Sequence, residues 1–151
     1  MALKNYTTAI SVEKTIGEIQ QLLAKAGANR IMTEYDDTGN IVALSFQLKM
    51  VNDFISFSLP TDWRPVLEVL VKQRALPNGH YRDGRAEAQA RRTAWRITKD
   101  WVDAQLAIIE TRMVSTAQVF LPYAVTDDGR KLYERFAVDS KMLLGGGNDG
   151  N

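Results

Sequence analysis

Hydrophobic positions in the first half of the chain change from helical spacing to strand spacing. Between residues 12 and 26, apolar residues recur every three or four positions, which predicts an amphipathic helix capped by Ser11. Between residues 30 and 59, apolar residues recur at every second position, in three runs separated by residues 36–40 and 51–53. This pattern predicts a three-stranded antiparallel meander that stops at Pro60, with the first helix covering its apolar face.

Two further helices are predicted after the meander. Thr61 or Asp62 can cap a helix that ends near Ala75. Residues 85–113 contain no proline or glycine and keep an apolar stripe, which predicts one long helix of about 40 Å. A short extended piece is expected at residues 119–123, followed by an amphipathic turn or helix from Leu132. The predicted fold class is therefore α+β.

Length and composition indicate one domain. The chain has 151 residues, of which 45% are hydrophobic, and it shows neither an internal repeat nor a linker. We expect a single domain over residues 1–144 and a disordered Gly/Asn tail over residues 145–151. The long predicted helix extends beyond a small sheet, so part of it can pack against another subunit, and we expect a homo-oligomer. No apolar run approaches the roughly 20 residues of a membrane span, and no signal peptide is visible, which favours a cytoplasmic protein.

Few residues are suited to catalysis. The chain has no cysteine and a single histidine, His80, which excludes thiol catalysis, cysteine-ligated zinc and iron–sulfur clusters. The pairs Asp36–Asp37 and Asp127–Asp128 are each followed within two residues by glycine, which is typical of turns. No phosphate-binding glycine loop, dinucleotide fingerprint or nucleophile elbow is present. We therefore predict no catalytic residues, no metal and no cofactor, and a protein that is not an enzyme.

Positive charge is concentrated in one part of the chain. Residues 72–99 carry a net charge of +6 and the remaining residues −5, although the whole chain has only +1. Within this segment four basic residues recur at steps of 7, 4 and 3, which places them along one face of the long helix. With one residue of the preceding loop, they are the predicted phosphate-binding residues: Arg82, Arg85, Arg92, Arg96 and Lys99. The alternative is a solvated face neutralised by nearby carboxylates.

Aromatic residues near the basic segment can stack on unpaired bases. Tyr81 lies in a polar loop and Trp63 in the first turn of a predicted helix, so these two are the predicted stacking residues. Trp95 and Trp101 lie on or beside the apolar stripe of the long helix, where core packing is the stronger interpretation.

Residues 92–110, together with residues 119–123, resemble a family of small uncharacterised proteins encoded by bacteriophages and prophages. The resemblance extends to residues 5–8 and 30–32. It implies an accessory role in the cytoplasm of the host bacterium, either in handling DNA or in interfering with host defence. The helix–three strands–helix order also resembles the double-stranded-RNA-binding domain, but the second helix lacks the basic N-terminal cluster of that family.

These observations favour a phage-type accessory protein that binds nucleic acid, most simply single-stranded DNA, without catalysis. Two alternatives remain open. One is an oligomeric anti-defence protein that sequesters a small nucleotide signal with the same arginines, and the other is a protein–protein adaptor. The sequence does not distinguish DNA, RNA and a small nucleotide as the ligand.

Overall fold

The computed structural model describes residues 1–81 and 83–138. In chain order, the elements are α1 (Val12–Lys25), β1 (Arg30–Tyr35), β2 (Ile41–Met50), β3 (Asp53–Ser58), α2 (Trp63–Lys72), the 3-10 helix η1 (Asn78–Tyr81), α3 (Arg85–Glu110), α4 (Thr116–Phe120), the 3-10 helix η2 (Leu121–Tyr123) and α5 (Leu132–Val138). The predicted α+β fold is confirmed, including the meander, the N-terminal helix and the long third helix.

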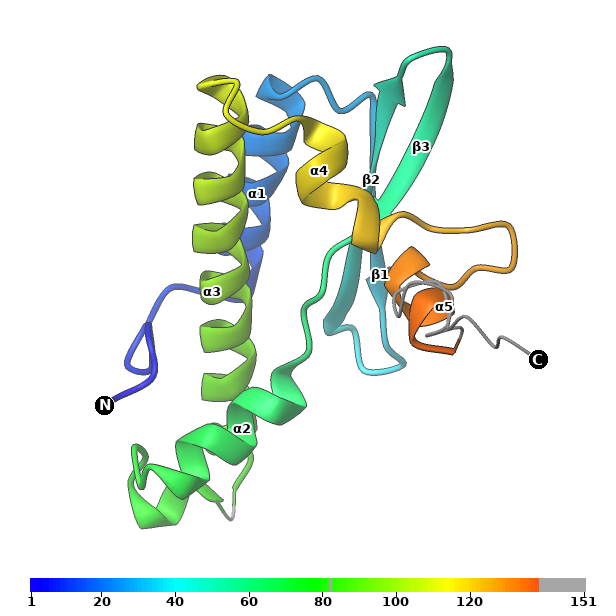
Figure 1. The fold of residues 1–151 in the computed structure, drawn as a ribbon. Helices are drawn as coiled ribbons and strands as arrows, with labels where there is room; N and C mark the ends of the chain where they lie inside the picture. Colours follow the sequence, from blue (N-terminus) through cyan, green and yellow to red (C-terminus); the bar gives the residue numbers. More distant parts are fainter. Residues whose placement is uncertain (82, 139–151) are drawn as a thin grey trace, which may run out of the picture.

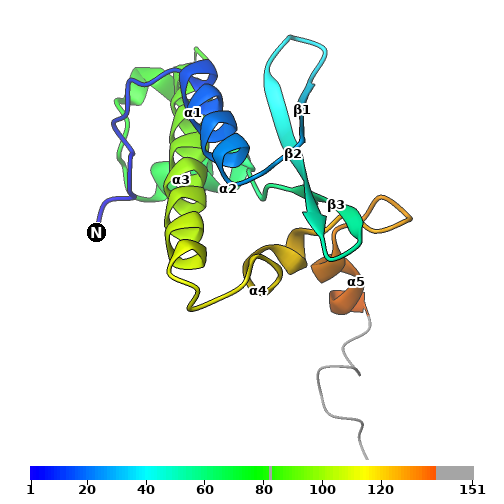
Figure 2. The ribbon, with the colours of Figure 1, turned by 90° about the horizontal axis from the view of Figure 1, so that it is seen from above.

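The sheet has two different faces. Its strands lie in the order β1-β2-β3 and both pairings are antiparallel. Along β2, Leu44, Phe46 and Leu48 are buried, whereas the residues between them point to the opposite side. We call the side of the buried residues the inner face and the opposite side the outer face. Helices α1 and α3 lie side by side over the inner face (Figures 1 and 2).

The core lies between the inner face and the helices. Ile19 and Leu23 of α1 and Val102 of α3 are almost completely buried against it. Trp95 is also buried, which confirms its predicted packing role. Phe120 of α4 closes the core, with its ring centroid 5.4 Å from that of Phe46 in an edge-to-face contact.

The predicted extended piece at residues 119–123 is wrong, because this segment is helical. Ser115 and Gln118 form a capping box that starts α4, and Pro122 lies in the 3-10 helix η2 that follows. The chain then bridges to the edge strand β3 at Ala124 and enters α5, as the pattern from Leu132 predicted. Helix α5 lies on the far side of the sheet from α1 and α3 (Figure 1).

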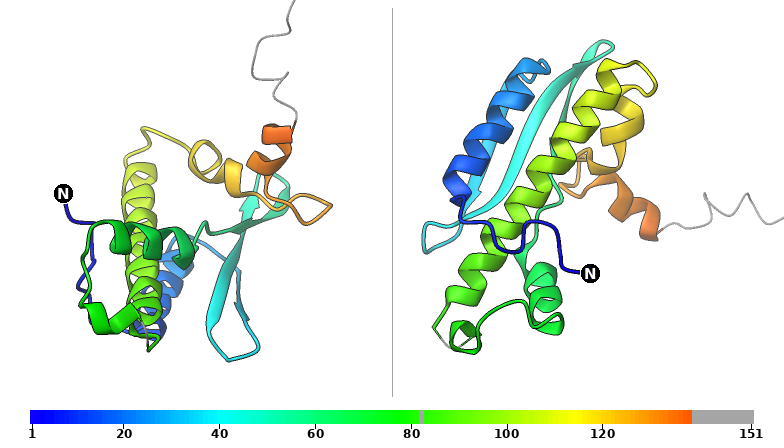
Figure 3. Two further views of the ribbon diagram at one scale, coloured as in Figure 1. Left: turned by 90° about the horizontal axis from the view of Figure 1, so that it is seen from below. Right: turned by 90° about the vertical axis from the view of Figure 1, so that its left-hand side faces the viewer.

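The N-terminal segment before α1 runs across α3 (Figure 3). Its backbone carbonyls at Tyr6 and Thr8 accept hydrogen bonds from the Gln89 side chain at 2.9 and 3.1 Å. The predicted tail at residues 145–151 lies outside the described residues. Among the described helices, none is long and apolar enough to cross a membrane.

Replacement of Phe120 tests the importance of this core contact. Because its side chain is completely buried against the rings of Phe46, Phe57 and Trp101, Phe120→Ala is expected to lower the free energy of unfolding by about 3–5 kcal/mol. Urea denaturation followed by circular dichroism measures the loss. The exposed neighbour in Leu121→Ala is the control, and equal losses in the two variants would contradict the packing described here.

Candidate nucleic-acid interface

Arg92, a predicted phosphate-binding residue, contacts the protein's own backbone. Its Nε donates a hydrogen bond to the Thr8 carbonyl at 3.3 Å, and its Nη2 donates to the Gln89 side chain. Thr93, beside it, donates to the Asn5 carbonyl at 3.1 Å. Arg92 therefore helps to hold the N-terminal segment on α3, and this leaves fewer of its donors for an external phosphate.

The other basic residues of the α3 stripe are also engaged within the chain. Arg96 forms an ion pair with Glu18 of α1 and is only 16% exposed. Lys99 pairs with Asp103 at 3.5 Å and is 19% exposed. Arg85 pairs with Asp83 at 2.6 Å, but more than half of its side chain is in solvent. Arg82 lies outside the described residues. The binding role of this stripe stays a prediction, and of its described members Arg85 offers the most exposed guanidinium.

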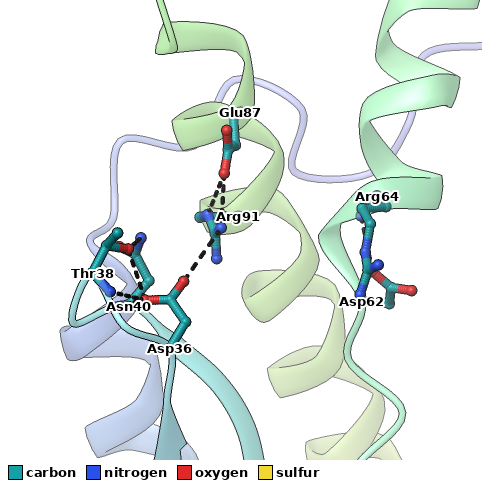
Figure 4. Close-up of polar contacts among 7 residues, drawn as sticks. All are labelled: Asp36, Thr38, Asn40, Asp62, Arg64, Glu87 and Arg91. Carbon is teal, nitrogen blue, oxygen red and sulfur yellow. Dashed lines mark hydrogen bonds and ion pairs between the residues drawn. The ribbon is translucent and has the colours of Figure 1, made fainter.

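Arg91 is a central residue that the sequence pattern did not single out. Its Nη2 lies 2.7 Å from Glu87 and 3.9 Å from Asp36, joining α3 to the β1–β2 turn (Figure 4). Its guanidinium carbon also lies 4.7 Å from the centroid of the Trp63 ring, a cation–π distance. The four-residue spacing of Glu87 and Arg91 was the available signal, since residues i and i+4 of a helix are neighbours.

One aspartate of each pair, Asp36 and Asp128, stabilises a turn, as predicted. Asp36 Oδ1 accepts hydrogen bonds from the Thr38 hydroxyl and from the backbone N–H groups of Thr38 and Asn40. These bonds, chiefly that of the Thr38 hydroxyl, lower the pKa of Asp36 below its ordinary value. Asp128 accepts bonds from Thr126 and Arg130 in the same manner, which lowers its pKa as well. Within the described ranges, no group of three or more histidine, aspartate or glutamate side chains could hold a metal ion.

The two predicted stacking residues lie apart. Trp63 is the first residue of α2, whereas Tyr81 ends the 3-10 helix that follows the other end of α2. The Tyr81 side chain is partly exposed and its hydroxyl donates a long hydrogen bond, 3.4 Å, to the Leu76 carbonyl. The structure therefore does not place both rings at one binding site.

Trp63 instead meets residues from the C-terminal part of the chain. A pocket of about 290 Å³ lies between the start of α2 and the segment that leads into α5. Three aromatic and two basic side chains line it: Trp63, the buried Trp95, Tyr133, Arg64 and Lys131. We call it the Trp63 pocket. Lys131 Nζ lies 6.0 Å from the Tyr133 ring centroid, and Arg64 makes an exposed ion pair with Asp62, also in the lining.

A second, polar cleft opens on the outer face of the sheet. It measures about 460 Å³ and lies between the three strands and the segment from Val125 to Glu134. Lys131 lines both this cleft and the Trp63 pocket, so the two hollows meet at its side chain.

A larger hollow, of about 540 Å³, lies at the C-terminal ends of α1 and α3. Core residues such as Leu23, Phe46 and Phe120 form most of its wall. Its charged rim holds Lys25 with two carboxylates, Asp103 and Glu110, so it does not present a basic surface to phosphate. Of the three hollows described above, the Trp63 pocket is the one lined by a predicted stacking residue, Trp63.

Comparison of the chain with protein-family models, with curated proteins and with solved structures gives no match. The resemblance to phage proteins stays a prediction.

The β1–β2 turn gives a prediction about pH. The pKa of Asp36 in the folded protein should lie below 3.8, and removal of the hydroxyl in Thr38→Val should raise it toward that value. A lowered folded-state pKa means that this carboxylate stabilises the fold above its unfolded pKa and that the contribution is lost as the pH falls through the folded pKa. An NMR titration of the side-chain carboxyl carbon measures both pKa values. Identical values in the two proteins would contradict the assigned hydrogen bond.

A second prediction concerns the ion pair between Arg96 and Glu18. Because the Arg96 side chain is largely buried, Arg96→Glu should lower the free energy of unfolding by about 1–3 kcal/mol by placing two carboxylates together. Adding Glu18→Arg exchanges the charges and should restore most of the stability in urea denaturation. A double variant that is no more stable than the single variant would show that Arg96 does not depend on Glu18.

Proposed function

We propose that this protein binds single-stranded nucleic acid without catalysis, at the Trp63 pocket. The observation that supports this most strongly is the presence of two cations and of two aromatic rings besides the buried Trp95 around one hollow. Proteins that hold single strands combine stacking surfaces for bases with basic groups for the backbone. Trp63 and Tyr133 would stack on bases, and Arg64 and Lys131 would contact phosphates.

The surroundings of Trp63 favour this role. Arg91 lies over one face of the indole and is itself held by Glu87, so the ring is fixed in place before a ligand arrives. A base would take the other face. A side chain that is already ordered loses little conformational entropy on binding, which favours affinity. Tyr133, which is 45% exposed, supplies a second ring in the lining of the same pocket.

Charge favours a limited contact with the backbone. The net charge is only +1, and Asp62 offsets part of the positive charge of Arg64. Two phosphate contacts to a single strand correspond to a slope of about −1.4 for the logarithm of affinity against the logarithm of salt concentration. Nonspecific binding along duplex DNA requires more neutralised phosphates than these two contacts provide, so we propose a single strand as the ligand. A phage-type role in handling DNA belongs to the same proposal.

The size of the Trp63 pocket favours a second candidate function. At about 290 Å³ it lies at the small end of ligand pockets and has room for one nucleotide unit. Sequestration of a small nucleotide signal would use the Trp63 ring and the same two cations, Arg64 and Lys131. The length of the ligand that binds distinguishes the two functions.

Truncation of Trp63 tests the proposal. Fluorescence anisotropy with a labelled single-stranded DNA octanucleotide should show affinity reduced about five- to 160-fold in Trp63→Ala, the loss of about 1–3 kcal/mol of stacking on one base. Tyr35→Ala removes another exposed aromatic ring, on β1, and is the matched control with unchanged affinity expected. Circular dichroism confirms that each variant is folded.

Four results would contradict or redirect this proposal. Equal affinity of folded Trp63→Ala and the unaltered protein would exclude the pocket as the site. A duplex bound more tightly than its single strand would exclude a base-stacking mode. A mononucleotide that binds as tightly as the octanucleotide would favour nucleotide sequestration over strand binding. An RNA octanucleotide that binds more tightly than the DNA octanucleotide would identify RNA, rather than DNA, as the ligand.

A further inference from the structure

The outer face of the sheet carries a row of polar side chains at matched positions on the three strands. In the antiparallel register, Gln47 of β2 lies between Arg30 of β1 and Ser56 of β3. Ser45 in turn lies between Met32 and Ser58. Residues opposite each other on neighbouring strands share a face, so these groups form one continuous surface.

Exposed apolar side chains and cations border the polar row. Phe54 is 55% exposed and lies opposite Lys49 in the β2–β3 register, and Met32 is exposed to the same extent. Arg30 and Lys49 are exposed, and neither is ion-paired with a residue that the structure describes. The face thus offers hydrogen-bonding groups, one ring for stacking and two unpaired positive charges.

One residue links this surface to the Trp63 pocket. Lys131 belongs to the walls of both the pocket and the outer-face cleft. From Ala43 to Lys49 the outer face extends along β2 for about 20 Å, which is longer than one nucleotide requires.

We infer that the outer face is a second binding segment for the same single strand, which passes from the Trp63 pocket over Lys131 and onto the sheet. This inference rests on the proposed function and assigns the strand a length of several nucleotides. Arg30 and Lys49 contact phosphates, and Phe54 stacks on a base. Ser45, Gln47, Ser56 and Ser58 offer hydrogen bonds to base edges.

The chemistry of the face favours nucleic acid over a protein partner. The centre of a protein–protein interface is depleted of charge and enriched in large apolar side chains, whereas serine and glutamine occupy the centre of this surface. Glu34 and Glu134 also line the cleft and repel phosphate locally. The strand backbone therefore lies nearer to Arg30 and Lys49, with the bases turned toward the polar row.

The affinities of a trinucleotide and an octanucleotide of single-stranded DNA distinguish binding at the Trp63 pocket from binding on the outer face. With two phosphate contacts at the pocket and two on the sheet, the salt slope should steepen from about −1.4 for the trinucleotide to about −2.8 for the octanucleotide. Arg30→Glu combined with Lys49→Glu should return the octanucleotide to the affinity and slope of the trinucleotide, and leave trinucleotide binding unchanged. Lys14→Glu combined with Lys25→Glu makes the same change of charge on α1 and is the matched control.

The outcomes distinguish this inference from the proposed function. If the trinucleotide binds through Trp63 but the octanucleotide binds no more tightly, the second segment does not exist and the pocket stands alone. Equal weakening by the α1 control variant would show that only net charge matters, which would also overturn the inference. If neither oligonucleotide binds, the proposed function itself fails.

Discussion

The structure depends on the way α3 divides its surface between core packing and polar contacts. One side of the helix buries Ala90, Ala94 and Val102, and the adjacent side uses Gln89 and Arg92 to hold the N-terminal segment. A helix interior satisfies its own backbone groups, so its side chains are free to bind other segments. Here they bind the carbonyls of a segment that forms turns rather than a helix or strand, and the fold is assembled around α3.

This arrangement changes the meaning of the charge pattern. A concentration of basic residues in sequence predicts a phosphate-binding face, yet a largely buried cation must be paired to offset the loss of its hydration. Arg96 and Arg91 are paired with carboxylates from α1, α3 and the β1–β2 turn. Arg30 and Lys49 of the sheet are exposed and form no ion pair with a described residue, and both come from the part of the chain outside residues 72–99, which has a negative net charge. For the sheet, local net charge therefore does not identify the exposed cations, although Lys72, Arg74 and Arg85 of the basic segment are exposed as well.

The fold was more predictable from sequence than the candidate site. Periodicity and turn residues are local, so Ser11 as a cap and the limits of β1 could be identified from neighbouring positions alone. The helical α4 was missed because its apolar residues resemble a short strand, although the capping box at Ser115 was a visible signal. Trp63 was identified as a stacking candidate, but its pocket partners Lys131 and Tyr133 come from the other end of the chain. Such long-range neighbours depend on tertiary packing, which no pattern in a single sequence specifies.

The central claim is that a single strand meets Trp63 rather than the basic side of α3. The indole N–H resonances of the three tryptophans in an NMR spectrum test it most directly, because Trp63 and the buried Trp95 line the pocket, whereas Trp101 is outside its lining and packs against Phe120. On addition of a single-stranded DNA octanucleotide, the Trp63 resonance should shift while that of Trp101 stays in place. An unmoved Trp63 resonance, accompanied by shifts in the side-chain signals of Arg92 and Arg96, would contradict this account and return the binding site to α3.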